Sequence, residues 1–173
     1  DIARRRLAFE ELFFFAIGLK LLRSRRETVS VEPFQPVDMA PFYNALPFTL
    51  TDAQRRCVDE AIADMESGRP MNRLCQGDVG SGKTMVAAAC VYFCVKNGRQ
   101  AALMAPTELL AEQHYRGLAP LLERLNIRCA LLTGSTTAKT KRSVTAQLAT
   151  GEIDFAIGTH ALISGSVAYA DLG

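Results

Sequence analysis

The chain has 173 residues, of which 49% are hydrophobic and 22% are charged. These proportions exclude a disordered or collagen-like chain and are sufficient for one compact domain with a substantial core. The formal net charge is only +2, so composition alone is a weak indication of a polyanionic partner.

Residues 1–26 are predicted to form one long amphipathic helix, with apolar residues at helical spacing and arginines near both ends. Such a helix has to pack against another surface. Its most apolar part, residues 12–19, is shorter than the roughly 20 residues that cross a bilayer. Glu10 and Glu11 precede it and no small-residue cleavage site follows, which argues against a signal peptide. We therefore expect no membrane segment and a soluble, cytoplasmic protein.

Residues 27–47 contain four prolines and few periodic apolar positions, a pattern typical of an extended connector. We expect a domain boundary within this segment. The predicted organisation is a linker helix over 1–26, a connector over 27–47 and a folded lobe over 48–173.

From Leu50 onward the pattern becomes regular. Thr51 is a suitable N-cap for a helix that runs through Met65. The elements expected after it are a strand at 73–75, a helix at 85–96, a strand at 101–105, a helix at 107–124, a strand at 128–132, a helix at 136–149 and a strand at 153–157. Strands that alternate with helices predict an α/β fold, in which a parallel sheet carries helices on both faces.

Residues 77–84, Gly-Asp-Val-Gly-Ser-Gly-Lys-Thr, match the phosphate-loop pattern G-x-x-x-x-G-K-[ST] without a mismatch. Glycines let consecutive backbone N–H groups approach phosphate oxygens, and the helix that follows adds its positive N-terminal end. Lys83 supplies a charge for the outer phosphates, and the Thr84 hydroxyl can coordinate Mg²⁺. The pattern predicts binding of ATP with Mg²⁺. A chance glycine-rich turn is the alternative.

Three further loops follow strands of the predicted sheet and should lie at the same edge as the phosphate loop. They offer hydroxyls, backbone N–H groups and helix N-termini, which suit contact with a phosphodiester backbone without reading bases. The candidate residues for contact with such a backbone are Pro106, Thr107, Glu108, Thr133, Gly134, Ser135, Thr159 and His160. Helix capping and turn formation are equally good reasons for the threonines.

The cysteines and the basic residues indicate function less clearly than the loops do. The five cysteines form no C-x-x-C pair and are read as free thiols in a reducing compartment, not as metal ligands. Arginine clusters lie near both ends of residues 1–26, and further basic residues lie at 139–142. Such charge runs are more typical of solvated helix faces than of contact with nucleic acid.

Four segments carry a family resemblance: the phosphate loop, Ala-Pro-Thr-Glu-Leu-Leu-Ala-Glu-Gln-His at 105–114, Leu-Thr-Gly-Ser at 132–135 and Gly-Thr-His-Ala-Leu at 158–162. They resemble the opening motifs of superfamily 2 helicases. Residues 7–12, 46–51 and 71–78 narrow the resemblance to the RecG family, bacterial ATP-dependent DNA helicases that remodel stalled forks and recombination junctions. The motor of the transcription-repair coupling factor has similar loops and remains an alternative.

The resemblance implies a RecA-like lobe and adds two residues near the adenine base, Phe48 and Gln54. The complete nucleotide-binding prediction is Phe48, Gln54, Gly77, Asp78, Val79, Gly80, Ser81, Gly82, Lys83 and Thr84. A core position for Phe48 and a solvated helix face for Gln54 are the structural alternatives.

The resemblance also implies groups that this chain does not contain. Family members have an acidic motif on the next strand, and a second motor lobe and a wedge domain elsewhere; Asp154 is not expected to replace the acidic motif. The sequence is therefore interpreted as part of a helicase that binds ATP and lacks efficient hydrolysis alone. A nonenzymatic nucleotide- or DNA-binding module is the alternative from a different class, and a small-molecule kinase is weaker because nothing resembles an acceptor site.

Overall fold

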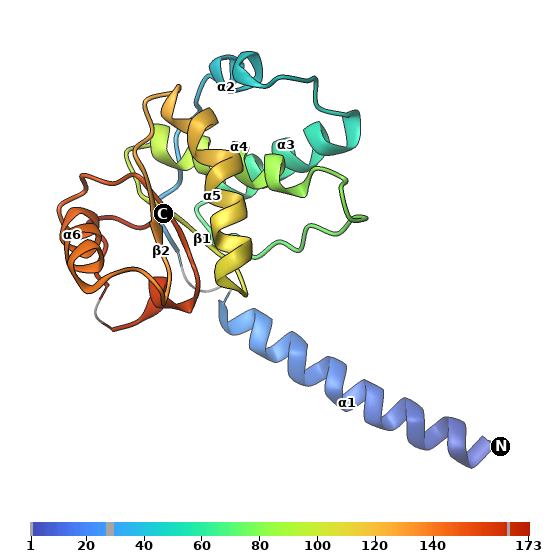
Figure 1. The fold of residues 1–173 in the computed structure, drawn as a ribbon. Coiled ribbons are helices and arrows are strands. Elements are labelled where there is room, and N and C mark those ends of the chain that lie inside the picture. Colours follow the sequence, from blue (N-terminus) through green and yellow to red (C-terminus); the bar gives the residue numbers. More distant parts are fainter. Residues whose placement is uncertain (1, 27–29, 166) are drawn as a thin grey trace.

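The structure is a computed structural model that describes residues 2–26, 30–165 and 167–173 (Figure 1). Its helices are α1 (Ile2–Arg26), α2 (Ala40–Ala45), α3 (Asp52–Glu66), α4 (Lys83–Lys96), α5 (Glu108–Glu123), α6 (Ala138–Ala149) and the short 3₁₀ helix η1 (His160–Ile163). Its strands are β1 (Ala101–Met104), β2 (Cys129–Leu132) and β3 (Phe155–Gly158). The predicted alternation of strands and helices is confirmed from α4 onward.

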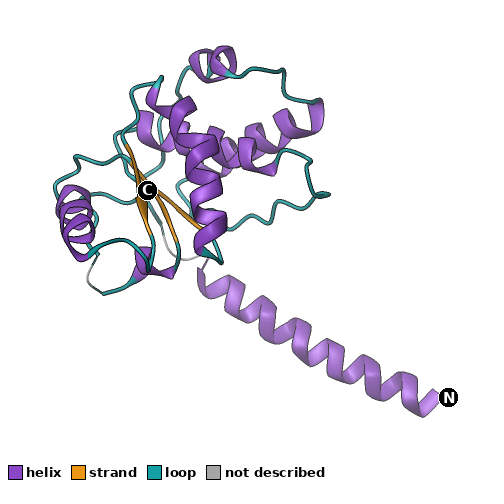
Figure 2. Ribbon diagram, in the orientation of Figure 1, coloured by secondary structure: helices purple, strands orange, loops and turns teal. Residues whose placement is uncertain are grey.

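The three strands form a parallel sheet in the order β1-β3-β2, with β3 in the centre (Figure 2). Alternate residues of β3 face opposite sides, as strand geometry requires. Phe155 and Ile157 belong to a core with α3, α4 and α5, whereas Ala156 belongs to a second core with α6. Helices therefore cover both faces of the sheet, as predicted.

Helix α3 begins where the sequence places its cap. The Thr51 hydroxyl accepts a hydrogen bond from Gln54 N at 3.3 Å, and Gln54 Oε1 accepts one from Thr51 N at 2.8 Å. This reciprocal pair is a capping box, which satisfies two of the backbone donors left free at a helix start. The helix ends at Glu66, and Gly68 then takes a left-handed conformation with φ of 71°.

The predicted strand at 73–75 is wrong, because no described segment pairs with it. A strand is stable only with a hydrogen-bonded neighbour. Leu74 is 86% exposed, and Arg73 turns instead to α3, where it forms ion pairs with Glu60 at 2.5 Å and Asp64 at 2.8 Å. The segment before the phosphate loop is thus extended without belonging to the sheet.

The predicted connector is only partly extended, and its first residues, 27–29, lie outside the described ranges. Residues 40–45 form helix α2, with Pro41 in the first turn, where a proline costs no hydrogen bond. Phe42 is fully buried against Tyr92 of α4, with ring centroids 5.6 Å apart. This segment therefore contributes to the main core instead of merely linking two units.

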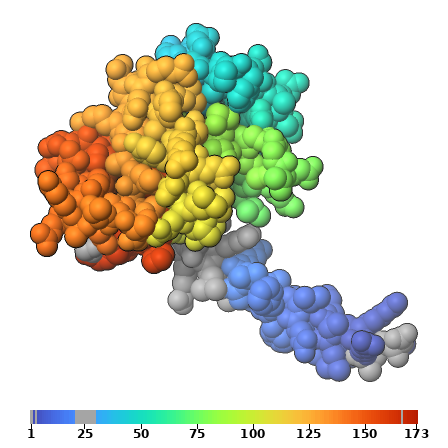
Figure 3. Space-filling model, viewed as in Figure 1, coloured from blue at the N-terminus to red at the C-terminus, as the bar shows by residue number. Residues whose placement is uncertain are grey.

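Helix α1 confirms the predicted N-terminal helix. It projects from the remainder of the chain, as Figures 1 and 3 show, and its large apolar side chains between Leu7 and Leu19 are exposed, with Phe14 at 70%. Phe9 and Phe13 stack on one another at 5.7 Å between centroids. None of the helices within the described ranges combines the length and hydropathy that a bilayer crossing requires.

Candidate functional site

The phosphate loop opens α4 as predicted. Gly82 is the N-cap residue of this helix and has a φ of 79°, and Gly80 has a φ of 82°. Both values lie in the left-handed region, which glycine adopts without the steric cost that a Cβ imposes. Val79 is fully exposed at the tip of the loop. The loop therefore presents its backbone to solvent directly before the positive end of a helix.

Lys83 folds back into this loop. Its Nζ donates hydrogen bonds to Gly77 O at 2.7 Å and Asp78 O at 2.6 Å, and lies 3.4 Å from Ser81 Oγ. A Cβ on Gly77 would lie 2.8 Å from Ser81 Oγ, so a side chain at this position would require the Ser81 hydroxyl to shift. The ammonium group is thus held inside the loop, and the partly exposed Thr84 follows it on the first turn of α4.

Gln54 joins α3 to the phosphate loop. Its Nε2 donates to Ser81 O at 2.8 Å while its Oε1 completes the capping box. A Cβ built on Gly82 would overlap Nε2, so this glycine serves both the backbone turn and the approach of Gln54. The alternative of a purely solvated helix face is wrong for Gln54. Phe48 is 49% exposed, so the core alternative is wrong for that residue.

In the loops after the three strands, several candidate residues are buried or hydrogen-bonded to nearby protein groups. Thr107 caps α5 by accepting from Leu110 N at 3.3 Å. Thr133 is buried, and its hydroxyl lies 3.0 Å from Ser135 Oγ. Thr159 is also buried, and its N–H donates to Leu132 O at 3.3 Å. The side chains of Thr133 and Thr159 therefore face inward.

The other residues predicted to contact DNA from these loops are accessible to solvent. Glu108 is half-buried, and the exposed ones are Pro106, Thr107, Gly134, Ser135 and His160. These residues lie at one edge of the sheet, because the three strands are parallel and end in register at Met104, Leu132 and Gly158. The structure thus brings the predicted loops to one edge, and their contact with DNA stays a prediction.

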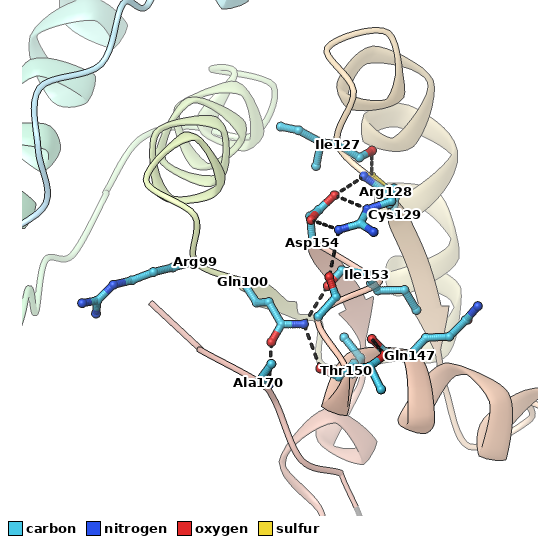
Figure 4. Close-up of polar contacts among 12 residues, drawn as sticks. Arg99, Gln100, Ile127, Arg128, Cys129, Gln147, Thr150, Ile153, Asp154 and Ala170 are labelled. Atoms are coloured by element: carbon cyan, nitrogen blue, oxygen red, sulfur yellow. Dashed lines mark hydrogen bonds and ion pairs between the residues drawn. The ribbon is translucent and has the colours of Figure 1, made fainter.

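Asp154 lies at the opposite edge of the sheet (Figure 4). Its carboxylate accepts hydrogen bonds from Arg128 N and Nε, both at 2.8 Å, and from Nη2 at 2.6 Å. Burial acts to raise the pKa of Asp154, but the hydrogen bonds from Arg128 outweigh it and hold the pKa below its ordinary value. Asp154 is a structural carboxylate, which agrees with its exclusion from the predicted catalytic groups.

We expect this pair to make stability depend on pH. Because the folded pKa of Asp154 is lowered, its contribution is present above the ordinary aspartate pKa of 3.8 and is lost as pH falls through the folded value. Urea unfolding of the wild type and Asp154→Asn should differ most near neutral pH, and the difference should shrink below about pH 4. A difference that stays constant across this range would contradict the assignment.

Gln100 is a structural residue that sequence reasoning missed. Its buried amide donates to Leu148 O at 3.0 Å and Ile153 O at 2.6 Å, and accepts from Ala170 N at 2.7 Å (Figure 4). These contacts hold residues 170–173 beside the amino end of β1, where Gln100 and Leu172 form a parallel bridge. A single glutamine before a short strand gives no sequence signal for such a network.

A glycine-rich loop that opens a helix beside a parallel sheet, with helices on both faces, defines a RecA-like P-loop lobe. A family model described as DEAD/DEAH box helicase matches residues 51–170. The chain therefore belongs to the DEAD/DEAH box helicase family.

Individual relatives support the same family assignment. The chain is 48% identical to the ATP-dependent DNA helicase RecG of Streptococcus pneumoniae serotype 4 over 174 residues, which cover 99% of this chain and 26% of the relative. The RecG protein of Bacillus subtilis is 45% identical over 174 residues, with coverages of 99% and 26%. A solved structure of RecG bound to a three-way DNA junction matches with a TM-score of 0.90 and 44% identity, covering 99% of this chain and 24% of that chain. The chain thus spans about a quarter of the length of these relatives.

Proposed function

We propose that this chain is the ATP-binding part of the first motor lobe of a RecG-like DNA helicase, which uses ATP to remodel replication forks and recombination junctions. The observation that carries the proposal is the phosphate loop, in which Lys83 is held by backbone carbonyls and to which Gln54 is hydrogen-bonded. The proposed reaction, ATP-dependent DNA unwinding, is that of the RecG relatives, and the proposed branched DNA is the kind bound in the solved RecG structure.

The residues present fit a nucleotide with Mg²⁺. The proposed nucleotide-binding set is the one predicted from sequence, in which Lys83 and Thr84 touch the reacting phosphates and Thr84 also ligates the metal. Within the described ranges no group of three or more acidic, histidine or cysteine side chains gathers to hold a metal ion. The remaining Mg²⁺ ligands would then be phosphate oxygens, water and groups outside this chain.

The proposed DNA partner is the backbone of a branched junction, contacted through the loops after β1, β2 and β3. Hydrolysis would require the acidic motif and the second motor lobe that the family resemblance implies, and the wedge domain would hold the junction. A bacterial cytoplasm is the proposed location.

A salt titration tests the DNA assignment. We expect the affinity of the complete protein for a labelled three-way DNA junction to fall steeply between about 50 and 200 mM salt, because phosphate contacts release counterions. The same preparation should hydrolyse ATP faster when the junction is added. Salt-independent binding, or no binding, would contradict the DNA assignment. Binding without DNA-stimulated hydrolysis would favour a nonenzymatic module.

A further inference from the structure

Glu108 joins two of the strand-end loops. It is the first residue of α5, directly after the loop that follows β1, and its Oε1 accepts a hydrogen bond from Ser135 N at 3.0 Å. Ser135 lies 27 residues further along the chain, in the loop that follows β2. A carboxylate that accepts from a backbone N–H forms a charge-assisted bond, which is stronger than a neutral one. This single contact therefore fixes one loop against the other.

Gly134 has no side chain, which allows the Glu108 carboxylate to approach its backbone closely. A Cβ built on Gly134 would lie 2.6 Å from Glu108 Oε1, closer than real Cβ contacts come. Gly134 is not among the described glycines with positive φ, so its backbone conformation is one that alanine also adopts. A side chain at position 134 would therefore require the Glu108 carboxylate to shift from its present place.

Both ends of the Glu108 bridge are themselves fixed. On the α5 side, the cap formed by Thr107 sets the first turn of the helix that carries Glu108. On the β2 side, Thr133 N donates to Thr136 Oγ1 at 2.9 Å, which closes the loop around Ser135. A bond between two fixed elements sets the distance between them, whereas a bond between mobile ones would not.

The charge of Glu108 is wrong for direct contact with DNA, since a carboxylate repels phosphate oxygens. We propose that Glu108 is a positioning residue that holds the loops after β1 and β2 at the spacing at which they grip the DNA backbone. This replaces the direct DNA contact expected from sequence, and it rests on the proposed function of these loops.

Two substitutions at Glu108 test the hydrogen bond. Glu108→Ala should weaken binding of the labelled three-way junction about tenfold, the size expected for loss of a charge-assisted hydrogen bond. Glu108→Gln keeps an oxygen that accepts from Ser135 N, so it should bind within about twofold of the wild type or more tightly. A glutamine variant as weak as the alanine variant would overturn the proposal, and so would tighter binding by Glu108→Ala, which would make the carboxylate a competitor of phosphate.

Gly134→Ala provides an independent test from the other loop. The new methyl group should displace the Glu108 carboxylate and weaken binding by a similar factor of about ten. In the double variant with Glu108→Ala the obstruction is gone, so binding should be no weaker than in Glu108→Ala alone. Losses that multiply to about a hundredfold would contradict a shared mechanism. If Glu108→Ala does not fold, the proposal still predicts weakened binding for Gly134→Ala and near wild-type binding for Glu108→Gln.

The wild-type titration separates this inference from the proposed function. If the wild type binds no junction, the DNA assignment of the whole edge fails. If it binds with the expected salt dependence and Glu108→Ala and Gly134→Ala bind equally well, only the positioning role fails.

Discussion

Replacing Lys83 with alanine is expected to remove DNA-stimulated ATP hydrolysis, lowering kcat/KM more than about a hundredfold. The Lys83 ammonium is held inside the phosphate loop by two backbone carbonyl groups, at 2.7 and 2.6 Å. In the proposed function this ammonium group would stabilise the negative charge that grows on the transferred phosphoryl group, and alanine supplies no charge in its place. Steady-state hydrolysis by the complete protein, with and without a three-way DNA junction, measures the effect.

Lys96 provides the matched control, because it lies at the other end of the same helix. Its Nζ donates to Leu125 O at 3.0 Å, far from the phosphate loop. Lys96→Ala should retain hydrolysis within about twofold and lose at most about 1 kcal/mol of stability. Lys83→Ala should unfold at nearly the wild-type temperature, since the loop carbonyls that it releases are exposed to water. Normal turnover in Lys83→Ala would refute the role assigned to this lysine.

Sequence reasoning predicted the features that depend on neighbours along the chain. Thr51 and Thr107 cap helices as expected, because an N-cap involves only residues two or three positions away. For α6 the cap is Thr137, so the helix begins at Ala138 and not at the predicted residue 136. Adjacent threonines can each cap a helix, and local pattern does not choose between them.

The failures concern contacts between distant residues. The largely apolar run at 73–75 suits a strand, but pairing depends on a partner that local pattern does not reveal. The prolines at 27–47 favour breaks in regular structure and so conceal helix α2, in which Pro41 occupies the first turn and Phe42 is buried against α4. The bond from Ser135 to Glu108 spans 27 residues, so no local spacing predicts it.

The second large effect is expected at Gly158, the last residue of the central strand. A Cβ built there would overlap the carbonyl oxygen of Leu132, and would lie 2.9 Å from its carbon and 3.0 Å from Leu162 Cγ. Gly158 is absent from the described glycines with positive φ, so close packing and not backbone strain requires glycine. We expect Gly158→Ala to destabilise the fold by about 3 kcal/mol or more, because a backbone carbonyl cannot move aside without distorting the sheet.

Urea unfolding of the purified protein measures this loss, with Gly117→Ala as the matched control. Gly117 lies inside α5, has no atom within 4 Å of a built Cβ, and is also absent from the glycines with positive φ. Alanine is a better helix former, so this control should be stabilised by about 0.5–1 kcal/mol. The same chemical change thus has opposite expected signs at the two positions. Equal unfolding midpoints for Gly158→Ala and the wild type would show that β2 and η1 shift at little cost, and that the edge carrying the strand-end loops is softer than its close packing indicates.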